Sequence, residues 1–356
     1  MVKKMSVLLI GYDSNLSLGV LYCLQPLNCD VYLLTSNIKN AARFSRFLKK
    51  LYYLEDKNDR ERIEEIVTTH SIDLIMPIDE LETRNVKVHL EELSKVAVCS
   101  WATEVDMFDI GINKMKLAKF LSNNDIPCPL FASIDSLNQM QERADAMGYP
   151  VLIKPDRGSF GRMIRRFDDW EELSKYYIEN EGQINDYILQ PFIIGSDITC
   201  NVICNNGEIV CYTIQESPVK NGHDFSSNDI LEFHDDSEVI DVISKMMKLL
   251  KWHGVACVDM RRDIRDNSVK ILEINGRFWA SVVSSYIRTG LNFPLIMVKL
   301  ALGKDPEISK AKIGKQLSLK QVISSKLKGK GASFKDTKYI SYLADPLARV
   351  IQVLKL

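Results

Sequence analysis

The stretch Gly254–Ser281 constrains the fold more than any other part of the 356-residue chain, because it has the pattern of two neighbouring strands. Side chains alternate between the two faces of a strand. Glu273, Asn275 and Arg277 of the second strand therefore share one face. Leu272 and Ile274 are expected on the other face. The sequence predicts a sheet with a polar face and an apolar face.

Asp259 lies on the first of these strands and joins the polar face only if it pairs with Glu273. That pairing requires an odd-length loop or a bulge around Arg265–Ser268, and a four-residue loop pairing Ile264 with Val269 would prevent it. Magnesium prefers carboxylate and amide oxygens together with substrate phosphates. The segment predicts a magnesium-nucleotide site, with a solvated polar face of an antiparallel hairpin as the alternative.

Residues 6–103 alternate apolar strands with helix-like stretches. The expected strands are 6–11, 30–35, 73–78 and 95–100, and the clearest helices are 16–24 and 60–70. Such alternation predicts a parallel sheet with crossover helices. Gly11 and Gly19 border the first strand-to-helix turn, but the G-x-G-x-x-G pattern of dinucleotide-binding turns is absent. An NAD-dependent enzyme is therefore disfavoured.

A second unit begins near the prolines of residues 125–129, which end an amphipathic helix expected at Asn113–Asn123. Lys154 is the only charged residue of an apolar strand, and the glycine-containing loop 157–163 follows that strand directly. This pattern is typical of a phosphate-binding site. A snorkelling lysine at a sheet edge explains it equally well.

Strands expected at 198–204 and 209–215 flank an N-N-G turn, which indicates an antiparallel hairpin. The polar loop 217–229 follows. Its length suits either a cover that selects substrates or a tolerated surface insertion.

The composition is that of an ordinary globular protein, with 46% hydrophobic and 26% charged residues. Eight cysteines are scattered without a C-x-x-C pair, which indicates free thiols in a reducing compartment. Nothing approaches the roughly 18 consecutive apolar residues of a membrane span, and the first apolar run is too short for a signal peptide. We therefore expect a cytoplasmic protein.

The charge is unevenly distributed. The net charge is -1, yet 12 lysines and arginines stand against 4 acidic residues from Gly303 onward, a net of +8. Residues 306–356 form a basic C-terminal extension, and 339–356 predict a terminal amphipathic helix. This extension is expected to dock on the protein's own body or on an acidic polymer or membrane surface. No base-stacking aromatic pattern supports a nucleic-acid partner, and the oligomeric state is open.

Six motifs follow one another along the chain: INK at 112–114, VLIKP at 151–155, GSFGR at 158–162, LQPFIIGSD at 189–197, VDMR at 258–261 and LEINGRF at 272–278. In this order they resemble the ATP-grasp superfamily, nearest to its carbamoyl-phosphate-synthetase-like and carboxylate-amine ligase branch. The resemblance covers roughly residues 6–305. It implies an α/β plus α+β fold: a parallel pre-ATP-grasp domain at 1–103, then an ATP-grasp domain at 104–305 with an antiparallel sheet and a lid subdomain at about 125–188.

The resemblance also implies how a nucleotide is held. Lys114 and Lys154 would contact the phosphates of ATP. Three small residues would belong to a lid loop that closes over the phosphates, namely Gly158, Ser159 and Gly161. Four residues would line the adenosine pocket: Gln190 near the base, Phe192 and Ile193 through backbone hydrogen bonds, and Asp197 at the ribose.

For the metal, the resemblance implies that Asp259, Glu273 and Asn275 hold one or two magnesium ions, with manganese as a substitute. Arg277 would stabilise charge on the transferring group. Arg288 and Arg261 are candidates to hold a substrate carboxylate, because a guanidinium binds it through two parallel hydrogen bonds.

The implied reaction joins a small-molecule carboxylate to an amine. ATP would phosphorylate the carboxylate to an acyl phosphate with release of ADP, and the amine would then attack the acyl carbon. Carboxyphosphate chemistry of the carbamoyl-phosphate type is one alternative. A non-catalytic ATP-binding regulatory module is another, because Pro191, Asn113 and Met163 depart from the usual motif residues.

Overall fold

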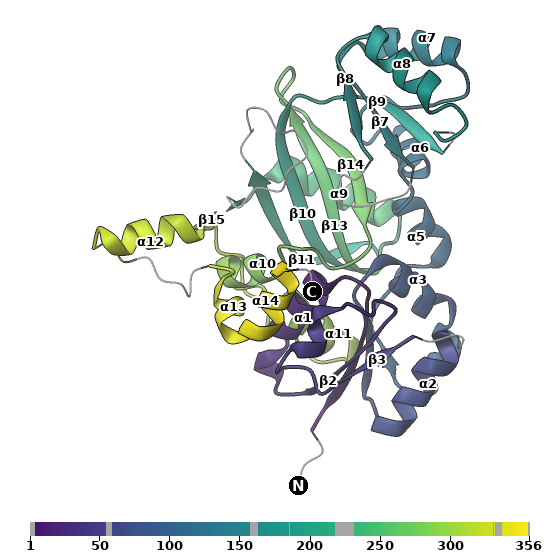
Figure 1. Ribbon diagram of the computed structural model, residues 1–356. Helices are drawn as coiled ribbons and strands as arrows, with labels where there is room; N and C mark the ends of the chain where they lie inside the picture. The colour runs from purple at the N-terminus through teal and green to yellow at the C-terminus, as the bar shows by residue number, and fades with distance from the viewer. Residues whose placement is uncertain are drawn as a thin grey trace.

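The structure is a computed structural model that describes residues 4–54, 59–156, 163–184, 186–217, 231–329, 331 and 337–354. Three sheets follow one another through the molecule, with the N-terminal sheet at one end and the smallest sheet at the other (Figure 1). The first sheet is parallel and the other two are antiparallel. The predicted α/β plus α+β fold class is confirmed.

The parallel sheet has the strand order β3-β2-β1-β4-β5. Its strands are β1 Ser6–Ile10, β2 Asp30–Thr35, β3 Lys50–Tyr53, β4 Leu74–Pro77 and β5 Val98–Cys99. Its helical elements are α1 Ser14–Cys23, η1 Gln25–Leu27, η2 Ala41–Phe44, α2 Asp59–His70, α3 Glu80–Val88 and α4 Leu90–Leu93. The sequence missed β3, a four-residue edge strand that is only partly buried and follows charged residues.

The four-stranded sheet, called here the lid sheet, has the order β6-β9-β7-β8. It is preceded by α5 Val105–Gly111 and α6 Lys114–Asn123 and contains β6 Ala132–Ser133, β7 Val151–Pro155, β8 Arg165–Phe167 and β9 Tyr187–Pro191. Helices α7 Leu137–Met147 and α8 Trp170–Glu179 pack on one face, over a core that includes Val151 and Ile153. The predicted helix at Asn113–Asn123 is confirmed.

The six-stranded sheet, called here the central sheet, has the order β14-β13-β10-β11-β12-β15. Its strands are β10 Gly195–Asn205, β11 Glu208–Ser217, β12 Glu232–His234, β13 Gly254–Asp263, β14 Val269–Asn275 and β15 Gly314–Lys315. Helix α9 Ser237–Leu249 covers one face through Val239, Ile243 and Met246, spaced as one helical stripe (Figure 1). The predicted hairpin around N-N-G is β10–β11.

Strands β13 and β14 pair so that Asp259 lies opposite Glu273. The pairing register shifts immediately afterwards, because Met260 lies opposite Ile271 and Leu272 is left as an extra residue. A bulge was therefore needed, but it lies at Leu272 and not around Arg265–Ser268. It also corrects the predicted faces: Ile271 joins Ile274 in the buried core, and Leu272 is only half-buried.

The chain returns to the parallel sheet after β14. Helices α10 Val282–Thr289 and α11 Phe293–Ala301 pack with α1 and the first strand in one continuous apolar core. The ring of Trp279 meets that of Phe293 edge-on at 4.7 Å between centroids. Late residues therefore complete the core of the first hundred residues.

The C-terminal part consists of α12 Leu319–Leu327, α13 Ile340–Ala344 and α14 Pro346–Leu354. The helix predicted over 339–356 is confirmed but interrupted at Asp345, because a residue before proline disfavours the helical conformation. Strand β15 adds to the edge of the central sheet, which the sequence did not indicate. Across the described ranges, no helix has the length and apolar character needed to cross a bilayer.

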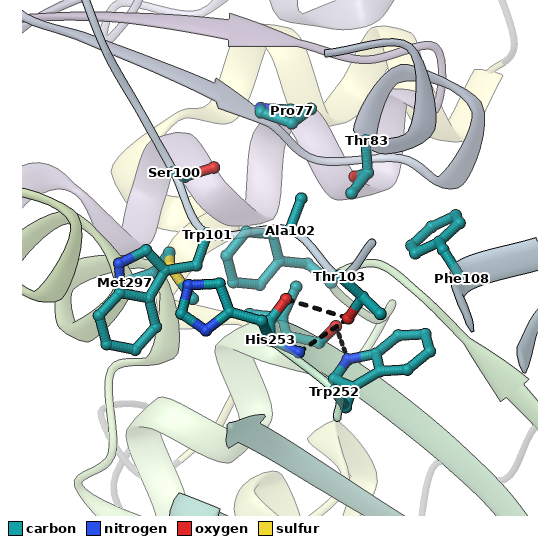
Figure 2. A pocket seen from close by; sticks show the side chains of 12 residues that line it. Pro77, Thr83, Ser100, Trp101, Ala102, Thr103, Phe108, Trp252, His253 and Met297 are labelled. Carbon is teal, nitrogen blue, oxygen red and sulfur yellow. Dashed lines mark hydrogen bonds between the residues drawn. The ribbon is translucent and has the colours of Figure 1, made fainter. Parts of the chain in front are cut away.

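Trp101 and His253 join the first unit to the central sheet (Figure 2). Their rings stack with centroids 4.6 Å apart, and the Thr103 hydroxyl hydrogen-bonds both the amide and the carbonyl of His253. A cavity of about 10 Å³ remains beside them. Gly254 has a φ of +107°, and a Cβ there would lie 2.5 Å from the Trp101 carbonyl oxygen. Only glycine fits at this close approach.

Replacing Gly254 by alanine should therefore lower the free energy of unfolding by on the order of 1–3 kcal/mol, since it combines backbone strain with a backbone clash. Urea unfolding measures the loss. Gly182→Ala is the control, because Gly182 also has a positive φ, of +81°, but no neighbour within 4 Å of the added Cβ. Equal losses in the two variants would contradict a tight joint at Gly254.

Candidate active site

The polar face of the central sheet gathers oxygen ligands from three adjacent strands. Asp259 on β13 pairs with Thr199 on β10 and with Glu273 on β14, and residues paired across strands share a face. The Thr199 hydroxyl donates to Asp259 Oδ1 at 2.9 Å. The opposite face of the same strands is the core beneath α9. The apolar side therefore anchors the strands that position the polar side.

Asn275 connects the two carboxylates. Its amide nitrogen donates to Asp259 Oδ2 at 3.2 Å and to Glu273 Oε1 at 3.3 Å. Its amide oxygen accepts from Arg277 at 3.1 Å, and the same guanidinium donates to the Phe278 carbonyl at 2.8 Å. The structure thus brings together the predicted metal ligands and the predicted arginine.

Lys114 enters this cluster from the first turn of α6. Its ammonium lies 3.1 Å from Glu273 Oε2, and the side chain is almost fully buried. Asn113, at the position noted as a departure, is the N-cap of α6 and accepts from the Lys116 amide at 2.7 Å. Asp156, directly after β7, accepts from the Met115 amide at 2.8 Å and from the Asn113 side chain. Asp156 therefore fixes the start of α6 against the lid sheet.

Lys154 enters from the lid sheet. In the register of β7 with β9, Lys154 lies opposite Ile188 and Leu152 opposite Gln190, so all four lie on one face. The neighbouring Ile153 faces the lid core. Lys154 and Gln190 are both buried. The lysine is therefore not a snorkelling edge residue.

The charges of the cluster act on one another. Burial raises the pKa of Asp259 to about 7, and the nearby Glu273 adds to the rise. Burial also opposes ionisation of Glu273, but Lys114 and Lys154 outweigh it and hold its pKa below the ordinary value. Burial lowers the pKa of Lys154 to about 8. Buried ionisable groups with pKa values shifted this far are typical of functional sites.

The sequence analysis missed Thr199, Asp156 and Glu80. Glu80 begins α3 in the first unit, and its carboxylate accepts from the Gly276 amide at 3.1 Å, between Asn275 and Arg277. Burial raises its pKa, while Arg277 counteracts the rise. The neighbouring acidic residues Asp79 and Glu80, shortly after β4, are visible in the sequence as candidate site residues. The proximity of Glu80 to Gly276 depends on tertiary packing.

Three of the four residues assigned to the adenosine pocket, Phe192, Ile193 and Asp197, lie around Arg261. Arg261 donates to Asp197 Oδ1 at 2.6 Å and to the Ile193 carbonyl at 2.8 Å, and its guanidinium lies 4.6 Å from the ring centroid of Phe192. The Phe192 amide already donates to the Pro150 carbonyl. Arg261 therefore holds the predicted base and ribose contacts in place, which is a different role from binding a substrate carboxylate.

Three further predictions have different outcomes. Arg288, at the end of α10, donates to the Ile313 carbonyl at 2.8 Å, so its guanidinium contacts the C-terminal segment. Gly158, Ser159 and Gly161 lie outside the described residues. Met163, where glycine was expected, has a φ of +64°, the left-handed conformation in which glycine is usual.

The donor set fits a hard divalent cation. Asp259 and Glu273 offer carboxylate oxygens and Asn275 an amide, while no group of three or more His, Cys, Asp or Glu side chains suited to a metal occurs in the described part of the chain. Two carboxylates with room for phosphate oxygens is the usual magnesium arrangement at a nucleotide. Asp259, Glu273 and Asn275 are the residues that would hold such a cation.

The ordered motifs and this geometry agree with a comparison to known families. A family model for the ATP-grasp domain matches residues 112–281. This range includes both lysines, the three predicted metal ligands and Arg277. Residues 112–281 are an ATP-grasp domain. The matched range begins just before α6 and ends just before α10.

Among curated relatives, the chain is 27% identical to the carbamoyl phosphate synthase large chain of Methanoregula boonei over 252 residues, covering 67% of this chain and 24% of the relative. The large chain from Archaeoglobus fulgidus is 26% identical over 230 residues, 62% of this chain and 21% of the relative. The chain therefore spans less than a quarter of the length of these relatives.

Solved structures share the fold at low identity. The N5-carboxyaminoimidazole synthetase of Staphylococcus aureus has a TM-score of 0.69 and 15% identity, covering 92% of this chain and 86% of that one. The L-amino acid ligase of Bacillus licheniformis has a TM-score of 0.66 and 18% identity, covering 87% and 78%. The fold over most of the chain is therefore shared with these structures.

Asp259 should make stability depend on pH. Its pKa rises on folding from 3.8 to about 7, so the folded protein loses stability as the pH rises through this interval. Asp259→Asn cannot ionise, and its stability relative to wild type should grow in this interval by on the order of 1–3 kcal/mol. Urea unfolding without nucleotide or magnesium at several pH values measures the difference.

The matched control is Asp266→Asn, on an exposed loop. Hydrogen bonds from Ser268 hold the pKa of Asp266 at about 2, below its ordinary value, so stability from its charge is lost as the pH falls. The control difference should therefore stay constant between pH 3.8 and about pH 7 and change only at lower pH, with the opposite sign. A pH-independent difference for Asp259→Asn would refute the buried, protonated carboxyl.

Proposed function

We propose that the protein is an ATP-dependent ligase that activates a substrate carboxylate as an acyl phosphate and joins it to an amine. The observation that supports this most is the buried cluster of Lys114, Lys154, Glu273 and Asp259, in which two ammonium groups lie near paired oxygen ligands. Phosphoryl transfer needs alignment and charge neutralisation more than a side-chain nucleophile. The named relatives and structures include ligases and synthetases of this type.

In the proposed reaction, Lys114 and Lys154 bind the ATP phosphates. Asp259, Glu273 and Asn275 would hold magnesium, whose charge would neutralise the phosphate oxygens. A carboxylate oxygen of the substrate attacks the terminal phosphorus, the bond from that phosphorus to the bridging oxygen breaks, and ADP leaves. Arg277 stabilises the charge of the transferring group. The amine then attacks the acyl carbon, inorganic phosphate leaves with the bonding electron pair, and the amine loses a proton.

Glu80 is proposed to face the acceptor. Its carboxylate lies against Gly276, one residue before Arg277, and comes from a different part of the chain. A carboxylate with a raised pKa beside the transfer site suits binding of an ammonium group or acceptance of its proton. The parallel-sheet unit would thereby contribute to amine recognition.

A second candidate is carboxyphosphate chemistry, in which bicarbonate takes the place of the organic acid. The similarity to carbamoyl phosphate synthase large chains favours it. The same nucleotide site would serve both reactions, so the acid substrate is the property that separates them.

Release of ADP from magnesium-ATP, measured with a panel of amino acids, small carboxylates and bicarbonate, tests the proposal when hydroxylamine is present to trap acyl phosphates. Hydroxamate formed with particular organic acids supports the ligase. Release of ADP that depends on bicarbonate alone supports the second candidate. Tight ATP binding without any ADP or hydroxamate would favour a regulatory nucleotide-binding module.

Glu273→Gln should lower kcat by roughly 10²-fold or more, because a preorganised charge at the metal is lost while the side-chain shape is kept. The rate of ADP release at saturating ATP and magnesium measures this loss. Glu208→Gln, at the exposed far end of the central sheet, should leave the rate unchanged. Full activity in Glu273→Gln would show that Glu273 does not hold the metal.

Lys154→Met should weaken ATP binding by about ten- to a hundredfold, because a charged hydrogen bond to phosphate is removed. Isothermal titration with magnesium-ATP measures the affinity. The unliganded variant should be at least as stable as wild type, because a buried charge is replaced by an apolar side chain of similar length. Lys116→Met, exposed on α6, is the matched control, and equal affinities of the two variants would refute phosphate binding by Lys154.

A further inference from the structure

Helices α13 and α14 present their apolar side to solvent. Five aliphatic residues of these helices have exposed fractions between 54% and 66%: Leu343, Leu347, Val350, Val353 and Leu354. Within α14, the three- and four-residue spacings between 347, 350 and 354 place these residues along one side of the helix. A helix at a protein surface normally turns its polar side outward. The orientation of these helices is therefore the reverse of the usual one, because their apolar side, called here the apolar stripe, faces solvent.

Polar groups hold the opposite side of the helices against the body. The Asp345 carboxylate accepts from the Ser45 hydroxyl and from the Arg46 amide, and Gln352 hydrogen-bonds Asn15. Arg349 is 6% exposed. In Figure 1 the helix pair lies against α1. These contacts fix the orientation of the helices, so the apolar stripe is built into the fold.

Arg349 is itself satisfied on the buried side. Its guanidinium donates to Gln352 Oε1 at 2.9 Å and lies 4.8 Å from the ring centroid of Tyr342. Rolling the helix to bury its leucines would expose Ala348, which is fully buried in the main core, and would break these polar contacts. The stripe therefore stays outward in the isolated protein.

The neighbouring chain is strongly basic. Residues 304–338 contain ten lysines against three acidic residues, a net of +7. Helix α12, which extends away from the body, carries exposed Lys320 and Lys328 beside exposed Leu319, Ile323 and Leu327 (Figure 1). Apolar side chains flanked by lysines are the combination that binds the surface of an anionic bilayer.

The size of the stripe argues against a second copy of the chain as the occupant. The five side chains expose on the order of 500 Å², the upper end of apolar patches on ordinary monomers. A stable dimer buries about 800 Å² on each partner. The stripe is aliphatic and carries no aromatic anchor of the kind found at protein hot spots. A fluid apolar layer beneath anionic headgroups places no such demand on shape.

We propose that this face of the protein binds an anionic membrane surface, with α13 and α14 lying in the interface and their apolar stripe entering the headgroup-acyl boundary. The described lysines between 304 and 328 contact the anionic headgroups. The candidate active site on the central sheet takes no part in this binding, because the stripe belongs to helices that pack on the parallel-sheet unit. Membrane attachment would hold the enzyme near substrates that arise at the bilayer.

Flotation of the full-length protein with vesicles tests this proposal. One set of vesicles contains equal parts phosphatidylcholine and phosphatidylglycerol, and the other contains phosphatidylcholine alone. The wild-type protein should float with the anionic vesicles, and high salt should weaken this binding. Leu347→Gln/Val350→Gln should reduce the affinity for anionic vesicles by about tenfold or more, because two inserting side chains become polar.

The control is Ile38→Gln/Ile264→Gln, which changes two equally exposed isoleucines elsewhere on the surface and should bind like wild type. Circular dichroism and the thermal shift with magnesium-ATP check that each variant is folded. Absence of wild-type binding to both vesicle types, or unchanged binding of the stripe variant, would overturn the proposal. A concentration-dependent dimer that the stripe substitutions abolish, without vesicle binding, would replace it with self-association.

Discussion

The ion pair between the buried Lys114 and the partly buried Glu273 is the interaction on which the site depends. Removing two charges from water is costly, and such a pair persists only when further polar contacts compensate it. Here Asn275 donates to Glu273, and the ammonium of Lys154 adds a second positive charge nearby. The pair joins α6 to β14, so one electrostatic contact relates the helix that carries Lys114 to the strand that carries Glu273 and Asn275.

Small backbone features place these charges. The bulge at Leu272 brings Asp259 opposite Glu273 and turns Ile271 into the core, so the same irregularity serves the polar face and the apolar face. Asp156 caps α6 from the end of β7, which relates Lys114 to Lys154. Because the two lysines come from different elements, their distance from Glu273 depends on how the lid sheet lies against the central sheet. Alignment and charge in this site are thus set by the same contacts.

The C-terminal extension shows how charge and apolarity separate when a helix docks by its polar side. Asp345 and Gln352 satisfy their hydrogen bonds inside the protein, which leaves the aliphatic residues of α13 and α14 in contact with water. Exposure of these apolar side chains to water is unfavourable, and burying each methylene group would lower the free energy. The basic segment before these helices supplies the long-range attraction that an aliphatic stripe lacks. The positive charge of this segment acts over a long range and the apolar stripe acts on contact. Both properties favour binding to an anionic membrane surface.

The sequence by itself determined the alternating first unit, the hairpin at N-N-G, the helix after Asn113 and the shared face of Glu273, Asn275 and Arg277, because periodicity and turn chemistry are local. It also required an odd-length loop or a bulge for Asp259 to join that face. Only the tertiary structure decided where the bulge lies, because register depends on which residues the core accepts. Likewise, Glu80 and Asp156 are close to the site only through packing between distant segments. Arg261 hydrogen-bonds Asp197 and the Ile193 carbonyl, and these contacts join segments that are distant in the sequence. Spacing along a chain fixes the face of a residue, but its partners are fixed by the elements that pack against that face.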